Sequence, residues 1–227
     1  MDAPLLADAL HALGDSLRYY RDMGLTELPL PSDYLASPAD RLRRQEQELQ
    51  GCRSCKLCDG RSTVVFGSGN PEADLVVIGE GPGADEDQQG KPFVGRAGQL
   101  LTRMLESVQI SRETDAYILN VVKCRPPGNR NPEPDEIEAC SPFLAAQLAT
   151  IQPKVILALG SVAAQALLRT KEPIGKLRGR AHPYGSALLV PTFHPAFLLR
   201  NPGQEYKRMA WEDLKLARRE YDRLRGK

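Results

Sequence analysis

The chain has 227 residues, of which 41% are hydrophobic and 26% charged, a composition that excludes a disordered chain and a membrane bundle. Thirty basic and 29 acidic residues give a net charge of +1, so a strongly basic nucleic-acid-binding domain is excluded and any polyanion must bind at a local patch. Five cysteines are too few for a disulfide scaffold, and the first residues show no basic, apolar leader, so we expect a reducing, cytoplasmic setting.

Residues 1–50 predict a helical extension rather than an independent domain. Apolar side chains recur every three or four residues in its first part, which predicts an amphipathic helix: Leu6, Leu10, Leu13, Leu17 and Tyr20. Prolines then predict a linker over 26–32. Ser37 and Pro38 are typical of a helix N-cap and first helical position, and this second helix is expected to run to Gln50.

Residues 51–227 predict an α/β domain. Short apolar runs predict strands at 75–78, 117–122, 155–159 and 187–190, and helices are expected between and after them at 97–108, 135–151, 161–168 and 205–224. Apolar strands alternating with helices indicate a parallel sheet covered on both faces. Ligands of such sheets bind at the carboxyl ends of the strands, so the residues that follow each strand are the candidate site.

The cysteines predict a metal or cluster site. Cys52 and Cys55 form a C-x2-C pair, and Cys124 and Cys140 follow far along the chain. Four thiolates suit a tetrahedral zinc ion or an iron–sulfur cluster, and spacing alone does not choose between them. Cys58 could by its spacing replace any one of the others. A thioredoxin-like redox pair is disfavoured because no strand clearly precedes the C-x2-C pair.

A glycine-rich acidic loop over 79–87 follows the first strand. It lacks the Lys-Ser/Thr pair of a phosphate-binding loop and carries four acidic residues, so phosphate binding is disfavoured and water activation or stabilisation of a cation is favoured. The next loop contains Phe93 among glycines and prolines, where an aromatic ring is suited to stacking on a flat base.

The later strands end in polar residues. Asn120 offers both a donor and an acceptor, which matches the edge of a pyrimidine, and His194 stands between rigid prolines after the fourth strand. Basic side chains near these ends are candidates for contacts with DNA phosphates: Arg125, Arg130, Arg200 and Lys207.

Taken together, these motifs resemble the iron–sulfur, family-four uracil-DNA glycosylases of the uracil-DNA glycosylase superfamily. The resemblance covers roughly residues 50 to 222 and rests on pieces that occur in the family's order: Cys52-x2-Cys55, Gly79-Glu80-Gly81-Pro82-Gly83, Gly90-x-Pro92-Phe93-Val94-Gly95-x-Ala97-Gly98, Asn120-Val121-Val122-Lys123-Cys124-Arg125-Pro126-Pro127, Cys140 and His194-Pro195-Ala196. It implies a three-layer α/β/α sandwich with a small parallel sheet, a [4Fe-4S] cluster and excision of uracil from single- and double-stranded DNA, by a monomer.

The resemblance also implies roles for single residues. Cys52, Cys55, Cys124 and Cys140 would be the cluster ligands, which leaves Cys58 as a bystander. Phe93 would stack on the extruded uracil, Asn120 would pair with its polar edge, and His194 would face the carbonyl oxygen that gains negative charge. Residues 80–82, Glu80, Gly81 and Pro82, would line the pocket and position the attacking water.

The general base is left open by the resemblance. Other branches of the superfamily carry an aspartate in the first motif, whereas this chain has Glu80, and Glu86 is a second candidate. A metal-bearing DNA-binding or polymerase-associated module without glycosylase activity is the alternative hypothesis. The set formed by Glu80, Phe93, Asn120 and His194 favours the enzyme, because a mere DNA-binding module has no need of it.

Overall fold

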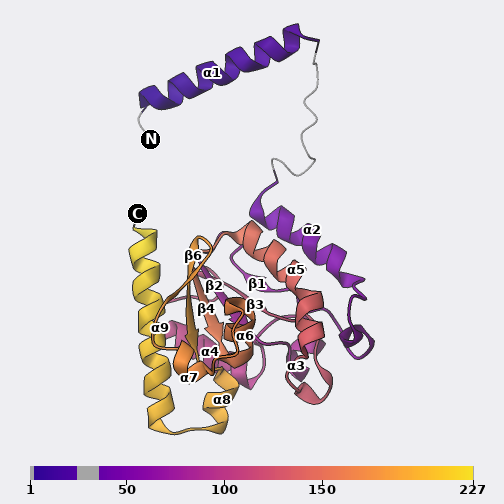
Figure 1. The fold of residues 1–227 in the computed structure, drawn as a ribbon, viewed down its shortest axis with the longest axis vertical. Helices are drawn as coiled ribbons and strands as arrows, with labels where there is room; N and C mark the ends of the chain where they lie inside the picture. Colours follow the sequence, from indigo (N-terminus) through magenta and orange to yellow (C-terminus); the bar gives the residue numbers. More distant parts are fainter. Residues whose placement is uncertain (1–2, 25–35, 227) are drawn as a thin grey trace. The chain divides into compact units, whose positions relative to one another are not determined.

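The computed structural model describes residues 3–24 and 36–226, and the chain divides into two units, Met1–Ala36 and Ser37–Lys227. The first unit contains helix α1 (Ala3–Asp22), where the leucine spacing predicts a helix (Figure 1). The linker predicted at 26–32 lies outside the described residues.

A six-stranded sheet forms the centre of the second unit, in the order β1-β3-β2-β4-β6-β5. Four strands are parallel and correspond to the four predicted apolar runs: β2 (Leu75–Gly79), β3 (Ala116–Asn120), β4 (Val155–Leu159) and β6 (Ala187–Thr192). The edge strands β1 (Ser68–Gly69) and β5 (His182–Tyr184) pair antiparallel and were not predicted, because two or three residues are too few to show an apolar pattern.

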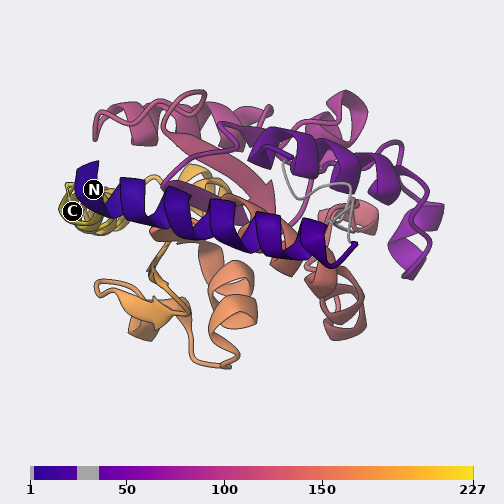
Figure 2. The same cartoon turned by 90° about the horizontal axis from the view of Figure 1, so that it is seen from above.

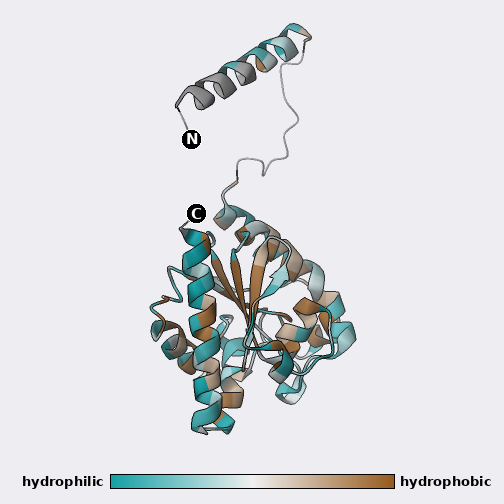
Figure 3. Cartoon of the chain, turned by 60° about the vertical axis from the view of Figure 1, so that its left-hand side comes forward, coloured by the Kyte–Doolittle hydropathy of each residue, from teal (hydrophilic) through white to brown (hydrophobic). Residues whose placement is uncertain are grey.

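Helices cover both faces of this sheet, which confirms the three-layer α/β/α arrangement (Figure 2). Because side chains alternate along a strand, Val76 and Ile78 pack with one set of helices while Leu75 and Val77 pack with the other. The first face is covered by α2 (Pro38–Gln50), α5 (Pro134–Ile151) and α6 (Gly160–Leu168), and the second by α4 (Arg96–Glu106), α8 (Pro195–Arg200) and α9 (Gln204–Arg225). Figure 3 shows the apolar strands enclosed by helices, with a hydrophilic surface on α9.

Shorter helices complete the domain. These are η1 (Lys56–Asp59), α3 (Ala84–Gln89), η2 (Pro127–Asn129) and α7 (Ile174–Leu177). The part of the chain that the structure describes contains no helix long and apolar enough to cross a membrane.

Helix α2, which falls within the predicted extension 1–50, belongs to the second unit. The Ser37 side chain accepts a hydrogen bond from the Asp40 N–H at 3.2 Å, as expected of an N-cap. Leu42 and Leu49 are buried in the core that α2 shares with α5, so this helix is part of the α/β domain.

The loops after β2 and β3 are tied together. The sequence predicts a second strand that runs to residue 122, but β3 ends at Asn120. Val121 and Val122 still donate backbone hydrogen bonds to the carbonyls of Gly79 and Glu80, at 2.9 and 3.1 Å. Two of the motif-bearing loops are therefore held side by side at the carboxyl edge of the sheet.

Candidate active site

A cavity of about 290 Å³ lies at the carboxyl ends of β2, β3 and β6. All six residues assigned to base binding from the sequence line it: Glu80, Gly81, Pro82, Phe93, Asn120 and His194. They come from four separate segments, which the parallel sheet brings together at the carboxyl ends of its strands, as expected of open α/β sheets. The volume and the mixture of apolar and polar walls suit a small planar ligand.

Asn120 places an unpaired acceptor in this cavity. The residue is 1% exposed, and its Oδ1 has no hydrogen-bond partner within the described part of the chain. A buried polar atom without a partner costs about 1–3 kcal/mol, so such an atom at a pocket wall indicates a site for a ligand donor. The backbone carbonyl of Asn120 accepts a hydrogen bond from the buried ammonium of Lys123 at 2.7 Å, which fixes the backbone of the residue.

Phe93 forms an aromatic wall on a strained backbone. The residue is 5% exposed and has a φ of +54°, a left-handed conformation that is unfavourable for a bulky residue. Its ring lies against the backbone of Gly79, where a methyl group would be only 2.5 Å from Phe93 Cζ. Glycine at position 79 therefore lets the ring stand directly over the end of β2.

Glu86 fastens the loop that carries Phe93. Its Oε1 accepts hydrogen bonds from the N–H groups of Val94 and Gly95, both at 2.9 Å, and its Oε2 accepts one from Gly83 at 3.1 Å. The carboxylate lines the cavity, yet it is held by three backbone donors. This arrangement favours a structural role in the loop over the role of second candidate base.

His194 is held as a neutral donor. Its Nδ1 accepts a hydrogen bond from the Ala196 N–H at 3.1 Å, so the ring proton resides on Nε2. Burial, reinforced by the positive charge of Arg200, lowers the pKa of His194 to about 4. Its ring lies 5.7 Å from that of Phe93, centroid to centroid.

Of the two candidate bases, Glu80 has the surroundings that better suit the predicted role. It lines the cavity together with His194 and Arg200. Burial raises the pKa of Glu80, and the charge of Arg200 opposes that rise. A partly desolvated carboxylate in a pocket is suited to orient or activate water.

The four phosphate-contact candidates differ in how they are held. Arg200 lines the cavity and Lys207 is exposed at the start of α9. Arg125 donates to Asn129 Oδ1 at 2.8 Å. Arg130 also lines the cavity, but it is paired with the buried carboxylate of Glu136 at 2.6 and 2.8 Å, so its first role is to anchor its own loop.

The cysteines gather at a second cavity. Cys52, Cys55, Cys58, Cys124 and Cys140 line it together, with Leu49, Arg61, Lys123 and Phe143. Among the described residues, no three His, Cys, Asp or Glu side chains are already grouped closely enough to hold a metal ion. The cysteines nevertheless suit a metal cluster held by thiolates, because two cationic side chains beside them can balance the negative charge. Arg61 Nη1 lies 3.2 Å from Cys124 Sγ, and Lys123 is fully buried at the same cavity.

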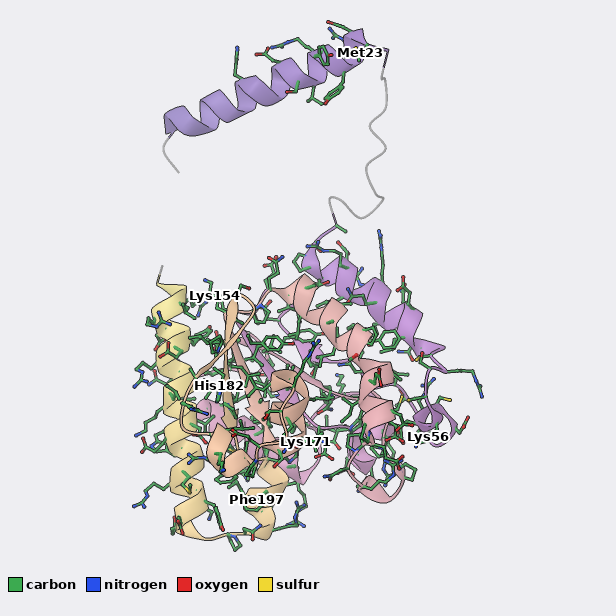
Figure 4. The ribbon with its side chains drawn as sticks, viewed as in Figure 1. Met23, Lys56, Lys154, Lys171, His182 and Phe197 are labelled. Atoms are coloured by element: carbon green, nitrogen blue, oxygen red, sulfur yellow. The ribbon has the colours of Figure 1, made fainter. Side chains whose placement is uncertain are left out.

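The loop with Cys52–Cys58 is tied to the helix that carries Cys140. Lys56, labelled in Figure 4, pairs with Glu133 and with Asp135 near the start of α5. These ion pairs connect the loop that carries Cys52, Cys55 and Cys58 to the start of the helix that carries Cys140. Cys58 Sγ lies 3.4 Å from the carboxylate of Asp59, a neighbour that disfavours the thiolate a metal ligand needs.

Several pocket residues received no role from the sequence, although Ala97, Pro126 and Ala196 stand within its recognised motifs. The far wall of the cavity is formed by the loop after β3 and by small residues of α4 and α8: Pro126, Asn129, Asn131, Ala97 and Ala196. Gly128 and Asn129 have left-handed φ values of 62° and 55°, which turn this loop toward the cavity. For this loop the Gly-Asn pair was the available signal, because both residue types tolerate that conformation.

The comparisons agree with this geometry. Residues 66–215 match the family described as the uracil DNA glycosylase superfamily. A type-4 uracil-DNA glycosylase of Thermotoga maritima is 47% identical over 174 residues, which are 76% of this chain and 90% of that protein. A type-4 uracil-DNA glycosylase of Saccharolobus solfataricus is 48% identical over 172 residues, 72% of this chain and 79% of that protein.

A DNA polymerase of Bacillus phage SP01 is a more distant relative. It is 30% identical over 150 residues, which are 66% of this chain but only 16% of the polymerase. The similarity therefore concerns one segment of a much larger protein.

Proposed function

Because the chain belongs to the uracil-DNA glycosylase superfamily, we propose that it hydrolyses the N-glycosidic bond of uracil in DNA and leaves an abasic site, the first step of base excision repair. The reaction needs the base to leave the helical stack, at a cost of a few kcal/mol that is smallest for mispaired or single-stranded uracil. Both single- and double-stranded DNA are therefore expected substrates.

The unpaired Oδ1 of Asn120 is the observation that carries the proposal. Uracil has an N3–H donor next to the O4 acceptor, and an amide side chain can accept from the first and donate to the second. Cytosine has an acceptor at N3 and a donor at N4. Its N3 lone pair would therefore face the lone pairs of Asn120 Oδ1, and the two would repel each other. Phe93 supplies the aromatic surface on which the ring stacks.

His194 is proposed to stabilise the leaving group. As the bond breaks, negative charge accumulates on uracil and positive charge on the sugar. A neutral imidazole with its proton on Nε2 donates a hydrogen bond to the O2 of uracil without first losing a proton. This interaction strengthens as charge develops, so it acts mainly on the transition state.

Glu80 is proposed to act on the sugar side. Its carboxylate orients the attacking water and stabilises the oxocarbenium-like sugar, while the positive charge of Arg200 opposes the burial-driven rise in its pKa and so favours the ionised form. Arg200 and the exposed Lys207, together with Arg125, would contact phosphates of the bound DNA. Arg130 would contribute only as far as its pairing with Glu136 allows.

We further propose that Cys52, Cys55, Cys124 and Cys140 hold a [4Fe-4S] cluster, as suggested by the similarity to type-4 enzymes and by the cysteine cavity. When bound, the cluster would cross-link the loop before η1, the loop after β3 and helix α5. Thiolate ligands require a reducing compartment, which supports a cytoplasmic location. A monomer is proposed as well and is testable by gel filtration.

The alternative, a DNA-binding or polymerase-associated module without activity, is less well supported. A binding module has no use for a neutral histidine donor, an unpaired amide oxygen and an aromatic wall in one cavity. The phage polymerase relative shares only a small part of its length with this chain.

The test is excision from a uracil-containing oligonucleotide, read as alkali-labile breaks, by the wild-type protein and by His194→Ala. We expect the substitution to lower excision at least about a hundredfold while DNA binding persists. His182→Ala is the matched control: His182, labelled in Figure 4, has its Nε2 hydrogen-bonded to the Leu177 carbonyl at 2.7 Å and is not among the residues that line the cavity. Parallel loss of binding and excision in His194→Ala would make His194 a structural residue instead.

A further inference from the structure

Arg112 lies outside every motif recognised in the sequence, yet its guanidinium is bound to the loop that carries Phe93. Nη1 donates to the Phe93 carbonyl at 2.9 Å, and Nη2 donates to the Pro92 carbonyl at 3.1 Å. These two carbonyls stand on either side of the Phe93 N–Cα–C unit. The side chain is only 17% exposed, so these bonds are largely shielded from water.

The guanidinium is itself fixed by helix α4. Nη1 also donates to Thr102 Oγ1 at 3.0 Å, and the Thr102 hydroxyl donates to the Gly98 carbonyl at 3.2 Å. Gly98 is the residue of α4 against which the Phe93 carbonyl packs, since a methyl group there would lie 1.9 Å from the Phe93 oxygen. The first turns of α4, Arg112 and Phe93 therefore form one connected hydrogen-bonded unit.

The backbone of Phe93 needs such support. A left-handed φ on a bulky residue costs free energy and persists only where the surroundings determine it. Glu86 accepts from the two N–H groups that follow Phe93, and Arg112 donates to the carbonyls before and after its Cα. The carboxylate of Glu86 thus binds the N–H groups of the turn formed by residues 92–95, and the guanidinium of Arg112 binds its carbonyl groups.

We propose that Arg112 is a positioning residue for base recognition: its guanidinium imposes the strained conformation that presents the ring of Phe93 to the base. The inference rests on the proposed function, in which Phe93 stacks on the flipped uracil. Lysine cannot replace arginine in this role, because one ammonium cannot reproduce a planar fork directed at two carbonyls and a hydroxyl.

The experiment compares wild type with Arg112→Gln and Arg112→Lys in three readouts: inhibition by free uracil, kcat and KM on a uracil-containing oligonucleotide, and the melting temperature. Stacking on an aromatic ring accounts for a large part of base affinity, so we expect free uracil to inhibit both variants about tenfold more weakly. A similar fall in kcat/KM is expected. Equal inhibition by uracil in wild type and in both folded variants would overturn the proposal.

Arg218→Gln is a matched control. Arg218 donates to the carbonyls of Val108 and Gln109 at 2.9 and 2.7 Å, and Gln109 has a φ of +57°, so this arginine supports a second left-handed residue away from the cavity. Its loss should lower the melting temperature and leave uracil inhibition unchanged. An equal effect of Arg112→Gln and Arg218→Gln on uracil inhibition would show general destabilisation and refute a specific role.

A double substitution separates positioning from direct contact. If Arg112 acts through Phe93, then Arg112→Gln adds no further loss of uracil affinity to Phe93→Ala. Additive losses would contradict the proposal. A wild-type protein that neither excises uracil nor binds it would instead refute the proposed function, so the two failures are distinguishable.

Discussion

Replacing Gly79 with alanine should disable the pocket while the domain still folds. The added methyl group would lie 2.5 Å from both Asn120 Oδ1 and Phe93 Cζ. Nonbonded carbon atoms prefer a separation of about 3.5 Å or more, so the two recognition groups must each retreat by about 1 Å or the strand must move. A misplacement of this size costs about a hundredfold in rate, or about 2.7 kcal/mol of transition-state stabilisation.

The assay is kcat/KM on a uracil-containing oligonucleotide, with the melting temperature measured in parallel. We expect a loss of about a hundredfold in excision and a loss of stability of about 1–3 kcal/mol from overpacking. Gly175→Ala is the control, since a methyl group there would meet no atom of residues 3–24 and 36–226 within 4 Å. A folded Gly79→Ala protein with activity within threefold of wild type would refute the geometry assigned to Asn120 and Phe93.

Three further predictions concern the histidine, the cysteines and a buried ion pair. Because the pKa of His194 is lowered to about 4, kcat should show no acidic break near pH 6.5, and a break there would mean that the histidine titrates normally. Since the unfolded chain takes up that proton first, the unfolding free energy should fall by about 3 kcal/mol as the pH drops from about 6.5 to about 4, and denaturant titrations of His194→Gln should show a smaller fall. Cys140→Ser should remove the brown colour and visible absorption of a cluster, whereas Cys58→Ser should retain them, and the reverse pattern would overturn the ligand assignment. Asp213→Asn should destabilise the domain by about 3–5 kcal/mol in thermal unfolding, because it leaves the largely buried Arg178 guanidinium without its charge partner. In the wild type this guanidinium lies 2.8 Å from Asp213, and the Arg178 side chain is 10% exposed. An unchanged melting curve would contradict this prediction.

The parallel sheet and the motif residues of the pocket could be predicted from the sequence because both have local signals. A strand buried on both faces is a continuous apolar run, and Asn120 and His194 stand directly after such runs. Because parallel strands end on the same side of a sheet, the sequence also predicts that the two side chains lie in one pocket.

Other features depend on contacts between distant parts of the chain. Arg112 follows Phe93 by 19 residues and contacts backbone carbonyls, which carry no side-chain pattern. Arg130 was assigned to DNA from its charge, but the buried carboxylate of Glu136, in the first turn of α5, accepts two hydrogen bonds from its guanidinium. Edge strand β5 includes Pro183, which is a poor strand former away from a sheet edge.

The central claim is that this pocket recognises and excises uracil, and a matched set of oligonucleotides tests it most directly. Uracil, thymine or cytosine is placed at one position of otherwise identical single- and double-stranded DNA, and alkali-labile breaks are measured for the wild-type protein. The unpaired amide of Asn120 and the neutral donor His194 predict breaks at uracil and none at cytosine. Intact uracil strands, or equal cleavage at cytosine, would contradict the account.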